Sequence, residues 1–308
     1  MSMGSLWSIK QEFRLKVGLL ALTFAFLTAT QAVWRSLKNS VFAKVVGATH
    51  LPTVRGYSIF LLIPIILFYS KLVDILRRHQ LLYVFTIVHA IGGLIFAFLL
   101  ADPSIGITNT IPSPSRWVGW GFYLFMESFS AFLSTSFWSF ANSINKPREA
   151  RNYYGLFVAG SKIGGILAAS GMWLFMMIGT GNLHGLTQYF LEKTVHVSDA
   201  VLIPTLLSSG SFFLFGAAIC TFFLMKLVPG YHLHGYEAVY QTEKKRDRIH
   251  EPFSLTASLN KMVDGLWVIA SLPYVLGIFS LSVFYDIINS IIDIIILVSA
   301  DESTSSVG

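Results

Sequence analysis

Seven long apolar blocks constrain the fold of this sequence more than any other feature. Each has about the length, or more, that an α-helix needs to cross a hydrocarbon core about 30 Å thick, roughly twenty residues. The blocks cover 17–37, 56–76, 81–101, 117–141, 153–180, 201–228 and 266–298. The mean hydropathy of +0.64 and a charged fraction of 12%, against about 25% in soluble domains, indicate that lipid surrounds these blocks.

Helices are the expected element, because lipid offers the backbone no hydrogen-bond partner and the blocks lack the alternation of barrel strands. The sequence therefore predicts an all-α membrane protein, a polytopic helical bundle. The last block is too long for one straight span, so we expect it to tilt, to break near Pro273 or to extend beyond the bilayer. No cleavable signal peptide is expected, because the first block lacks a small-residue cleavage site.

The Lys and Arg residues predict the orientation of the chain. With a cytoplasmic N-terminus, most of the 22 Lys and Arg residues fall on the cytoplasmic side, as the positive-inside rule requires. The cations left on the outer side are Arg35, Lys38, Lys44, Arg55, Arg116 and Lys193. The net charge of +6 is thus mostly an orientation signal and does not indicate a nucleic-acid surface.

The stretch "VWRSLKN", residues 33–39, places Arg35 and Lys38 three residues apart at the outer end of the first block. In one interpretation both side chains extend to the outer interface, and Trp34 is an aromatic anchor there. In the other, the two cations share one helical face and point into a water-filled cavity to attract an anion. Ionisable residues within spanning helices or at their ends often mark substrate pathways.

Two further charges lie deep in their blocks. Glu127 is about 15 Å from the outer end of the fourth block at 1.5 Å per residue, and Lys162 has a similar depth in the fifth. Each alone would cost about 2.5 to 3.5 kcal/mol on insertion scales. They either pair with one another across adjacent helices or line an aqueous path and meet substrate.

Three short motifs resemble known sites but lack their context. "GLFVAGSK", 155–162, transposes the Ser and Lys of a phosphate loop and lies inside a span, and "GTGNLHG", 179–185, misplaces the third glycine of a dinucleotide fingerprint. "HLHGYE", 232–237, is too sparse for a metal site. We expect no metal site, cofactor or catalytic residue. The glycines at 155, 160, 164 and 165, with nearby alanines, predict close helix packing instead.

Several longer segments resemble one transporter family. "VWRSLKNSVF" is similar to the R-[ST]-x-K-[DN] segment in the first helix of the bacterial and plastid type ATP/ADP translocases. The likeness continues through "LPTVRGYSIFLLIPIILFYSKLVDIL", "FYLFMESFSAFLSTSFWSFANSINKPREARNYYGLF" and "YVLGIFSLSVFYDIINSIID". It covers most of residues 30–295, and the segment around "FANSINKPREARNYYGLF" is its most specific part.

The resemblance implies a fold like that of the major facilitator superfamily, in which two six-helix halves alternate access to a central site. About seven of the expected twelve transmembrane helices are present. In the translocases, a Lys on helix one, a Glu on helix four and an acidic residue on helix seven are important for nucleotide transport, and these fall on Lys38, Glu127 and Asp293. With the two cations singled out above, the candidate substrate-binding set is Arg35, Lys38, Glu127, Lys162 and Asp293.

This resemblance implies an ATP/ADP antiporter, not an enzyme, with the six-helix half at 1–228, a basic cytoplasmic linker at 229–265, and the seventh helix with a truncated tail at 266–308. Expected partners are nucleotides, the lipid bilayer and a second half-transporter or a second copy of the chain; nucleic acid is not expected. The expected location is a bacterial inner membrane. Asn39 and Lys162 depart from the family pattern, which leaves a carrier of another organic anion, or a transport-inactive fragment or subunit, as alternatives.

Overall fold

The computed structural model describes residues 3–179, 198–228, 267 and 270–305. The chain divides into two compact units, Met1–Asp247 and Arg248–Gly308. In the first unit the helices are α1 (Met3–Val45), the short 3-10 helix η1 (Ala48–His50), α2 (Leu51–Ile75), α3 (Arg78–Ala101), α4 (Trp117–Ile144), α5 (Pro147–Gly179) and α7 (Asp199–Leu227). The second unit contains α10 (Pro273–Ser305). The expected linker at 229–265 lies outside the described residues.

The predicted class is confirmed: each of the seven apolar blocks falls in a helix, and the described residues contain no strand. Five of these helices are long and apolar enough to cross a membrane; their spans are Glu12–Val45, Ala48–Val73, Arg78–Ala101, Ala150–Ile178 and Asp199–Leu227. The chain is therefore an all-α, multi-pass membrane protein. The predicted break near Pro273 is also confirmed, because α10 begins at that residue, where a missing backbone N–H costs nothing.

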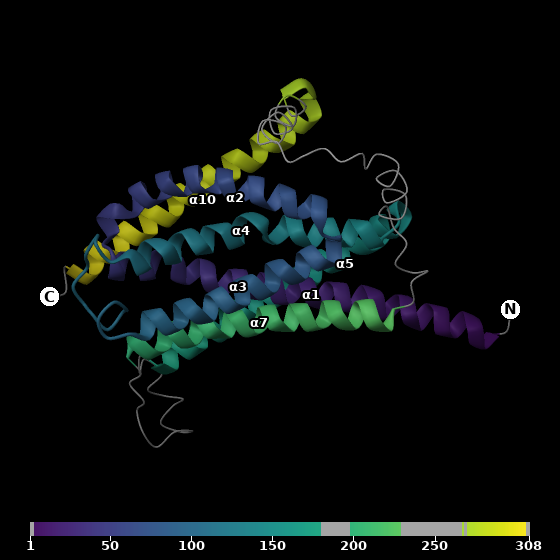
Figure 1. Ribbon diagram of the computed structural model, residues 1–308, viewed down its shortest axis with the longest axis horizontal. Helices are drawn as coiled ribbons and strands as arrows, with labels where there is room; N and C mark the ends of the chain where they lie inside the picture. The colour runs from purple at the N-terminus through teal and green to yellow at the C-terminus, as the bar shows by residue number, and fades with distance from the viewer. Residues whose placement is uncertain (1–2, 180–197, 229–266, 268–269, 306–308) are drawn as a thin grey trace, which may run out of the picture. The chain divides into compact units, whose positions relative to one another are not determined.

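Helix α1 is the centre of the first unit and packs along α5, α7 and α4, while α3 covers α7 and α4 (Figure 1). The side-chain contacts show that α1 and α4 run antiparallel. Near one end of the pair, the Lys16 Nζ donates to the Ile144 carbonyl at 2.9 Å. Further along, the rings of Phe24 and Phe137 stack with centroids 4.1 Å apart. Helix α2 packs mainly on α4.

Trp34 fills the meeting point of α1, α3, α4 and α7 and is only 1% exposed. Its Nε1 donates to the Leu207 carbonyl of α7 at 3.1 Å, and its ring centroid lies 4.9 Å from that of Phe129 in α4. Gly93 and Gly210 leave room for the indole, since a Cβ on either would come within 2.7 Å of a ring atom. The interpretation of Trp34 as an interfacial anchor is therefore wrong, because the bundle interior holds this side chain.

Two of the four predicted packing glycines of α5, Gly160 and Gly164, bring its backbone against α1. A Cβ on Gly164 would lie 2.5 Å from the Ala25 carbonyl oxygen, and one on Gly160 would lie 3.2 Å from Ala21. The Thr28 hydroxyl of α1 also donates to the Ser161 carbonyl at 2.8 Å. Gly155, by contrast, has open space where a Cβ would be, so close packing does not explain it.

An arginine organises the connection between α3 and α4. The Arg116 guanidinium donates to the carbonyls of Asn109 and Ile111 through Nη1, both at 3.1 Å, and to those of Ile105 and Gly106 through Nη2. The forked geometry of Arg suits several acceptors at once. Arg116 therefore has carbonyl partners within the α3–α4 connection, directly before α4 begins.

The close approach of α1 and α5 predicts a position-specific effect of substitution. Gly164→Ala should reduce the yield of folded protein, because the methyl group would collide with the α1 backbone, which cannot move without separating the helices. Gly171→Ala is the matched control on the same helix, since nothing lies within 4 Å of a Cβ there. Size-exclusion chromatography of the two detergent-solubilised variants measures the difference; equal monodisperse yields would contradict the close packing.

Candidate functional site

An ion pair joins α1 to α4 inside the first unit. The Lys38 Nζ lies 2.6 Å from Glu127 Oε1, and the two side chains are 15% and 23% exposed. The register that stacks Phe24 on Phe137 and packs Trp34 edge-on against Phe129 brings Lys38 and Glu127 to the same level. A charge held within a membrane span is costly when alone, so each residue offsets the cost of the other.

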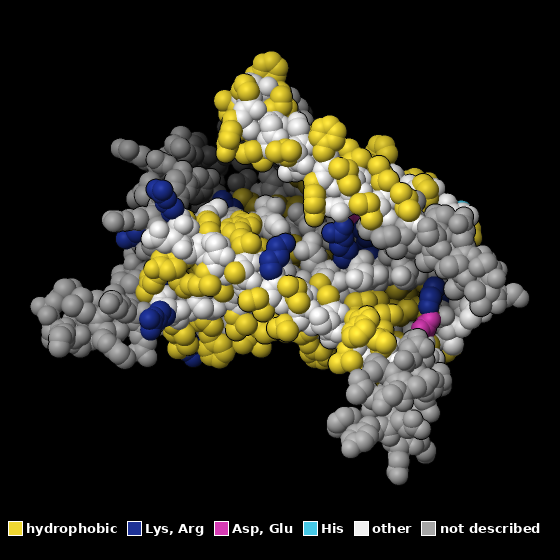
Figure 2. Space-filling model, turned by 180° about the vertical axis from the view of Figure 1, so that it is seen from behind, with side chains coloured by type: hydrophobic (Ala, Val, Ile, Leu, Met, Phe, Trp, Pro, Cys, Tyr) yellow, Lys and Arg dark blue, Asp and Glu magenta, His cyan; other side chains and the backbone are white. Residues whose placement is uncertain are grey.

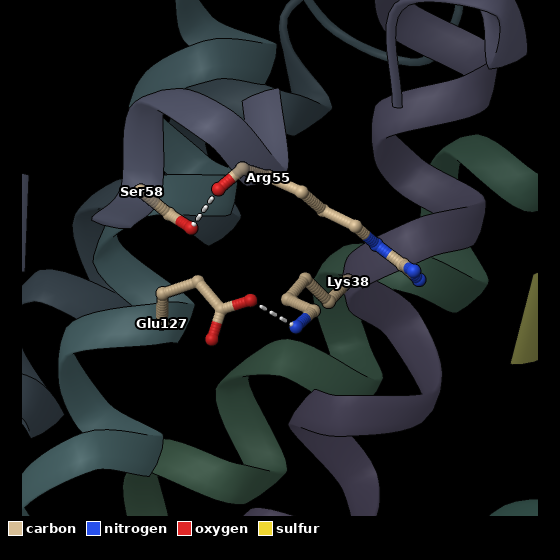
Figure 3. Close-up of polar contacts among 4 residues, drawn as sticks. All are labelled: Lys38, Arg55, Ser58 and Glu127. Carbon is tan, nitrogen blue, oxygen red and sulfur yellow. Dashed lines mark hydrogen bonds and ion pairs between the residues drawn. The ribbon is translucent and has the colours of Figure 1, made fainter. Parts of the chain in front are cut away.

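Tyr123 and Arg55 complete the group around this pair. Tyr123 is one turn before Glu127 in α4, and the Lys38 Nζ lies 4.8 Å from the centre of its ring, a distance typical of cation–π contacts. The Tyr123 hydroxyl interacts with both Arg55 and Glu127. In Figure 3 the Lys38 ammonium is turned toward the Glu127 carboxylate, and the Arg55 side chain reaches across from α2 to the Lys38 side. We call Lys38, Arg55, Tyr123 and Glu127 the cationic group.

The cationic group contains two cationic side chains, Lys38 and Arg55, and one carboxylate, Glu127, which pairs with Lys38. The aromatic ring of Tyr123 lies against the Lys38 ammonium. Part of this charge remains accessible, because neither member of the ion pair is fully buried. Arg offers a planar fork of donors, and Lys offers a compact point charge. Together they suit the binding of an anion with several oxygen atoms.

The remaining predicted site residues have different positions. Arg35 is exposed, unlike Lys38, so the two cations do not share one environment. Lys162 is also exposed, and the bond between Thr28 and Ser161 places it about 15 Å from the level of Lys38 along α1. The alternative in which Glu127 pairs with Lys162 is therefore wrong, because Glu127 pairs with Lys38. Asp293 falls in α10, and its side chain lies outside the described part.

No sequence pattern singles out Tyr123, and the signal for Arg55 is weak. Arg55 is one of the cations that the positive-inside rule leaves on the expected outer side. Its position next to Tyr123 depends on how α2 packs against α4, which no local pattern reveals. Figure 2 shows that Lys and Arg side chains reach the middle of a largely hydrophobic face as well as its edges.

A second ion pair, Lys44 with Asp199, joins the end of α1 to the start of α7. Its side chains are 46% and 51% exposed, so solvent screens this contact far more than the pair in the cationic group. For metals, the described ranges contain no group of three or more His, Cys, Asp or Glu residues that could hold an ion.

Ionisable side chains held between the helices of a multi-pass bundle, as Lys38 and Glu127 are here, are a common feature of membrane transporters. Comparison with known families agrees, because the model of the TLC ATP/ADP transporter family matches residues 2–302. The chain belongs to this family. No solved structure matches it.

Curated relatives include "ADP,ATP carrier protein 1" from three intracellular bacteria. The chain is 27% identical over 226 residues to that of Chlamydia muridarum, a match that covers 64% of this chain and 42% of the relative. It is 28% identical over 196 residues to that of Chlamydia pneumoniae, a match that covers 54% of this chain and 36% of the relative. It is 26% identical over 219 residues to that of Rickettsia prowazekii, a match that covers 65% of this chain and 43% of the relative. The chain therefore spans well under half the length of the curated relatives that it matches.

The partly buried ion pair predicts non-additive effects on stability. Lys38→Met and Glu127→Gln should each lower the free energy of unfolding, measured by thermal unfolding in detergent, by about 3 kcal/mol or somewhat less, because each leaves the opposite charge without its partner. The double variant should lose less than the sum of the two single variants.

The exposed ion pair of Lys44 and Asp199 provides the matched control for the double-mutant cycle on Lys38 and Glu127. Lys44→Ala and Asp199→Ala should each cost under about 1 kcal/mol, as is usual for exposed pairs, and their effects should be nearly additive. Additive losses at Lys38 and Glu127 would show that the contact between them does not stabilise the bundle.

Proposed function

We propose that this chain binds nucleoside di- and triphosphates at the cationic group and exchanges ATP for ADP across a membrane by alternating access. The observation that best supports this is the location of Lys38, Arg55 and Glu127 among the spans of a member of an ATP/ADP transporter family. The printed names of the relatives, ADP,ATP carrier proteins, are consistent with that substrate class.

The chemistry of phosphate suits these side chains. A nucleotide loses the hydration of several negative charges when it enters a protein site, and charge-assisted hydrogen bonds offset that loss. Arg55 supplies a forked contact and Lys38 a point charge. Both side chains can therefore donate hydrogen bonds to the oxygen atoms of a phosphate group.

Exchange of ion partners gives a physical reason for antiport. Without substrate, Lys38 is held by Glu127, and an incoming phosphate takes the place of that carboxylate. Nucleotide binding therefore shifts the equilibrium between two conformations, one with the Lys38–Glu127 pair and one without it. The size of this shift is limited by the difference between the affinities of the nucleotide for the two conformations. The return step is favoured when another nucleotide binds. No hydrolytic step is needed, because nucleotide gradients supply the driving force.

The other predicted residues remain part of the proposal. Arg35 and Lys162 are exposed, and both lie on the N-terminal side of Lys38 along α1, where we assign them to the path of the anion. Lys162 lies in the middle of the α5 span, too deep for its side chain to reach either interface easily. Asp293 is retained on the resemblance alone.

The proposed organisation follows the relatives. Residues 1–228 form a six-helix half, 229–265 a cytoplasmic linker and 266–308 the seventh helix. A second half-transporter or a second copy of this chain is the proposed partner. The proposed role is transport and not catalysis, in a bacterial inner membrane with the N-terminus in the cytoplasm.

Transport can be measured as uptake of labelled ATP into proteoliposomes that contain the purified chain and are preloaded with ADP. Uptake should depend on internal ADP, and Lys38→Ala should lower it about tenfold or more, since hydrogen bonds to charged groups contribute about 1.5 to 3 kcal/mol. Lys226→Ala is the control, because this exposed cation lies at the far end of α7 and should leave uptake unchanged.

Other results would separate the alternatives. Absence of uptake by a well-inserted wild-type chain would favour a transport-inactive fragment or subunit. Uptake of another organic anion in place of ATP would overturn the substrate class while retaining the transporter. An equal loss of uptake in Lys38→Ala and Lys226→Ala would remove the cationic group from the mechanism.

The proposed orientation predicts which loops are accessible from outside the cell. In a Cys220→Ala background, which removes the one cysteine of the chain, a membrane-impermeant maleimide should label Thr108→Cys on intact cells. It should label Lys146→Cys only after permeabilisation, because that residue follows α4 at the opposite end. Both positions are exposed. The reverse labelling pattern would contradict a cytoplasmic N-terminus.

A further inference from the structure

A group of aromatic rings lies next to the cationic group on the side of the α1–α2 turn. Trp120 of α4 is its centre: ring centroids lie 5.3 Å away for Phe42, 5.9 Å for Tyr57 and 6.2 Å for His50. These neighbours come from α1, α2 and η1, three separate elements. The Trp120 Nε1 donates to the Pro114 carbonyl at 3.0 Å, which fixes the orientation of the indole.

The rings and the charges follow one another along a single face of α4. Trp120, Tyr123 and Glu127 are spaced by three and four residues, the spacing of one helical face. The level of Trp120 is therefore about 10 Å from that of Glu127. Tyr123 connects the aromatic rings to the cationic group. Its ring centroid lies 5.3 Å from that of Phe42, and the Lys38 ammonium contacts the face of the same ring.

Tyr57 has the free surface that a bound ligand requires. It is 57% exposed although its ring contacts Trp120, so a large part of the side chain is not used in packing. Helix α4 connects this surface to the cationic group: Tyr57 packs on Trp120, and Trp120 is one turn from Tyr123, whose ring lies against the Lys38 ammonium. An accessible aromatic surface is thus linked to the cationic group through two neighbouring side chains of α4.

We propose that Tyr57 and Trp120 form a stacking subsite for the base of a nucleotide whose phosphates contact Lys38 and Arg55. This inference rests on the proposed function and adds a second contact region to it. A nucleoside phosphate is charged at one end and flat and aromatic at the other, and the two adjoining groups match these two ends. Stacking on aromatic side chains accepts any base, because every base has a π-face. The ligand class is therefore a nucleoside di- or triphosphate, with little discrimination among bases at this subsite.

An alternative role for these rings is the aromatic belt, since Trp and Tyr are common at membrane interfaces. A belt residue affects insertion in the membrane and has no reason to distinguish a nucleotide from an inorganic phosphate. A stacking residue does distinguish them, because only the nucleotide carries a base. Pyrophosphate is thus a matched ligand for ADP that lacks the nucleoside.

Calorimetric titration of the purified full chain in detergent with ADP and with pyrophosphate tests the subsite. Tyr57→Ala should weaken ADP binding about tenfold, from the usual contribution of base stacking, and leave pyrophosphate binding unchanged. Tyr57→Phe keeps the ring and should bind ADP as the wild type does. Trp117→Ala is the matched control, because Trp117 is 62% exposed at the same end of α4 and fits a belt role.

Each outcome decides between the two proposals. If the wild-type chain binds neither ADP nor pyrophosphate, the proposed function fails and the subsite fails with it. If the wild type binds ADP and Tyr57→Ala binds it equally well, only the stacking subsite is overturned. The subsite would also be overturned if Tyr57→Ala weakened the binding of ADP and of pyrophosphate equally, since such a loss would not depend on the base. Equal effects of Tyr57→Ala and Trp117→Ala on ADP binding would overturn it as well.

Discussion

The antiparallel register between α1 and α4 is the constraint on which the rest of the first unit depends. Trp34 fixes it, because this side chain occupies a space that Gly93 and Gly210 leave open and also packs on Phe129. Lys38 follows Trp34 by one helical turn, so the pairing with Glu127 is a consequence of where the indole lies. A slip by one turn, about 5.4 Å, would carry the ammonium away from the carboxylate and leave both charges without compensation.

The helical class and the approximate positions of the apolar spans could be predicted because length and apolar content are local properties of the chain. The ends of α1 could not, because this helix runs from Met3 to Val45 whereas its apolar block covers only 17–37. The positions of Arg55 and Tyr123 could not, because their proximity results from the packing of α2 on α4. The charge pattern singles out Lys38 and Glu127 as candidates and the family resemblance supports both, but the sequence does not indicate that they pair. The small residues show the same limit: Gly160 and Gly164 contact α1, whereas Gly155 has no such neighbour, although all three share one pattern.

Helix α4 illustrates why hydropathy is an incomplete guide within a bundle. It is absent from the five spans that length and apolar character select among the described residues, yet it carries Glu127 and many of the buried aromatic side chains. Its Ser, Tyr, Trp and Glu residues lower its hydropathy. They are tolerated because α1, α2 and α3 surround this helix and supply the contacts that lipid cannot. A central helix is therefore polar where it serves a site.

The charge balance of the cationic group also bears on what the protein keeps out. A proton or a metal cation that entered between the helices would meet two positive side chains and a carboxylate already engaged with Lys38. Moving one elementary charge through a potential of 100 mV releases about 2.3 kcal/mol, so an unguarded path would discharge the membrane. Because Lys38 pairs with Glu127, this contact leaves no uncompensated carboxylate that would attract a small cation between α1 and α4.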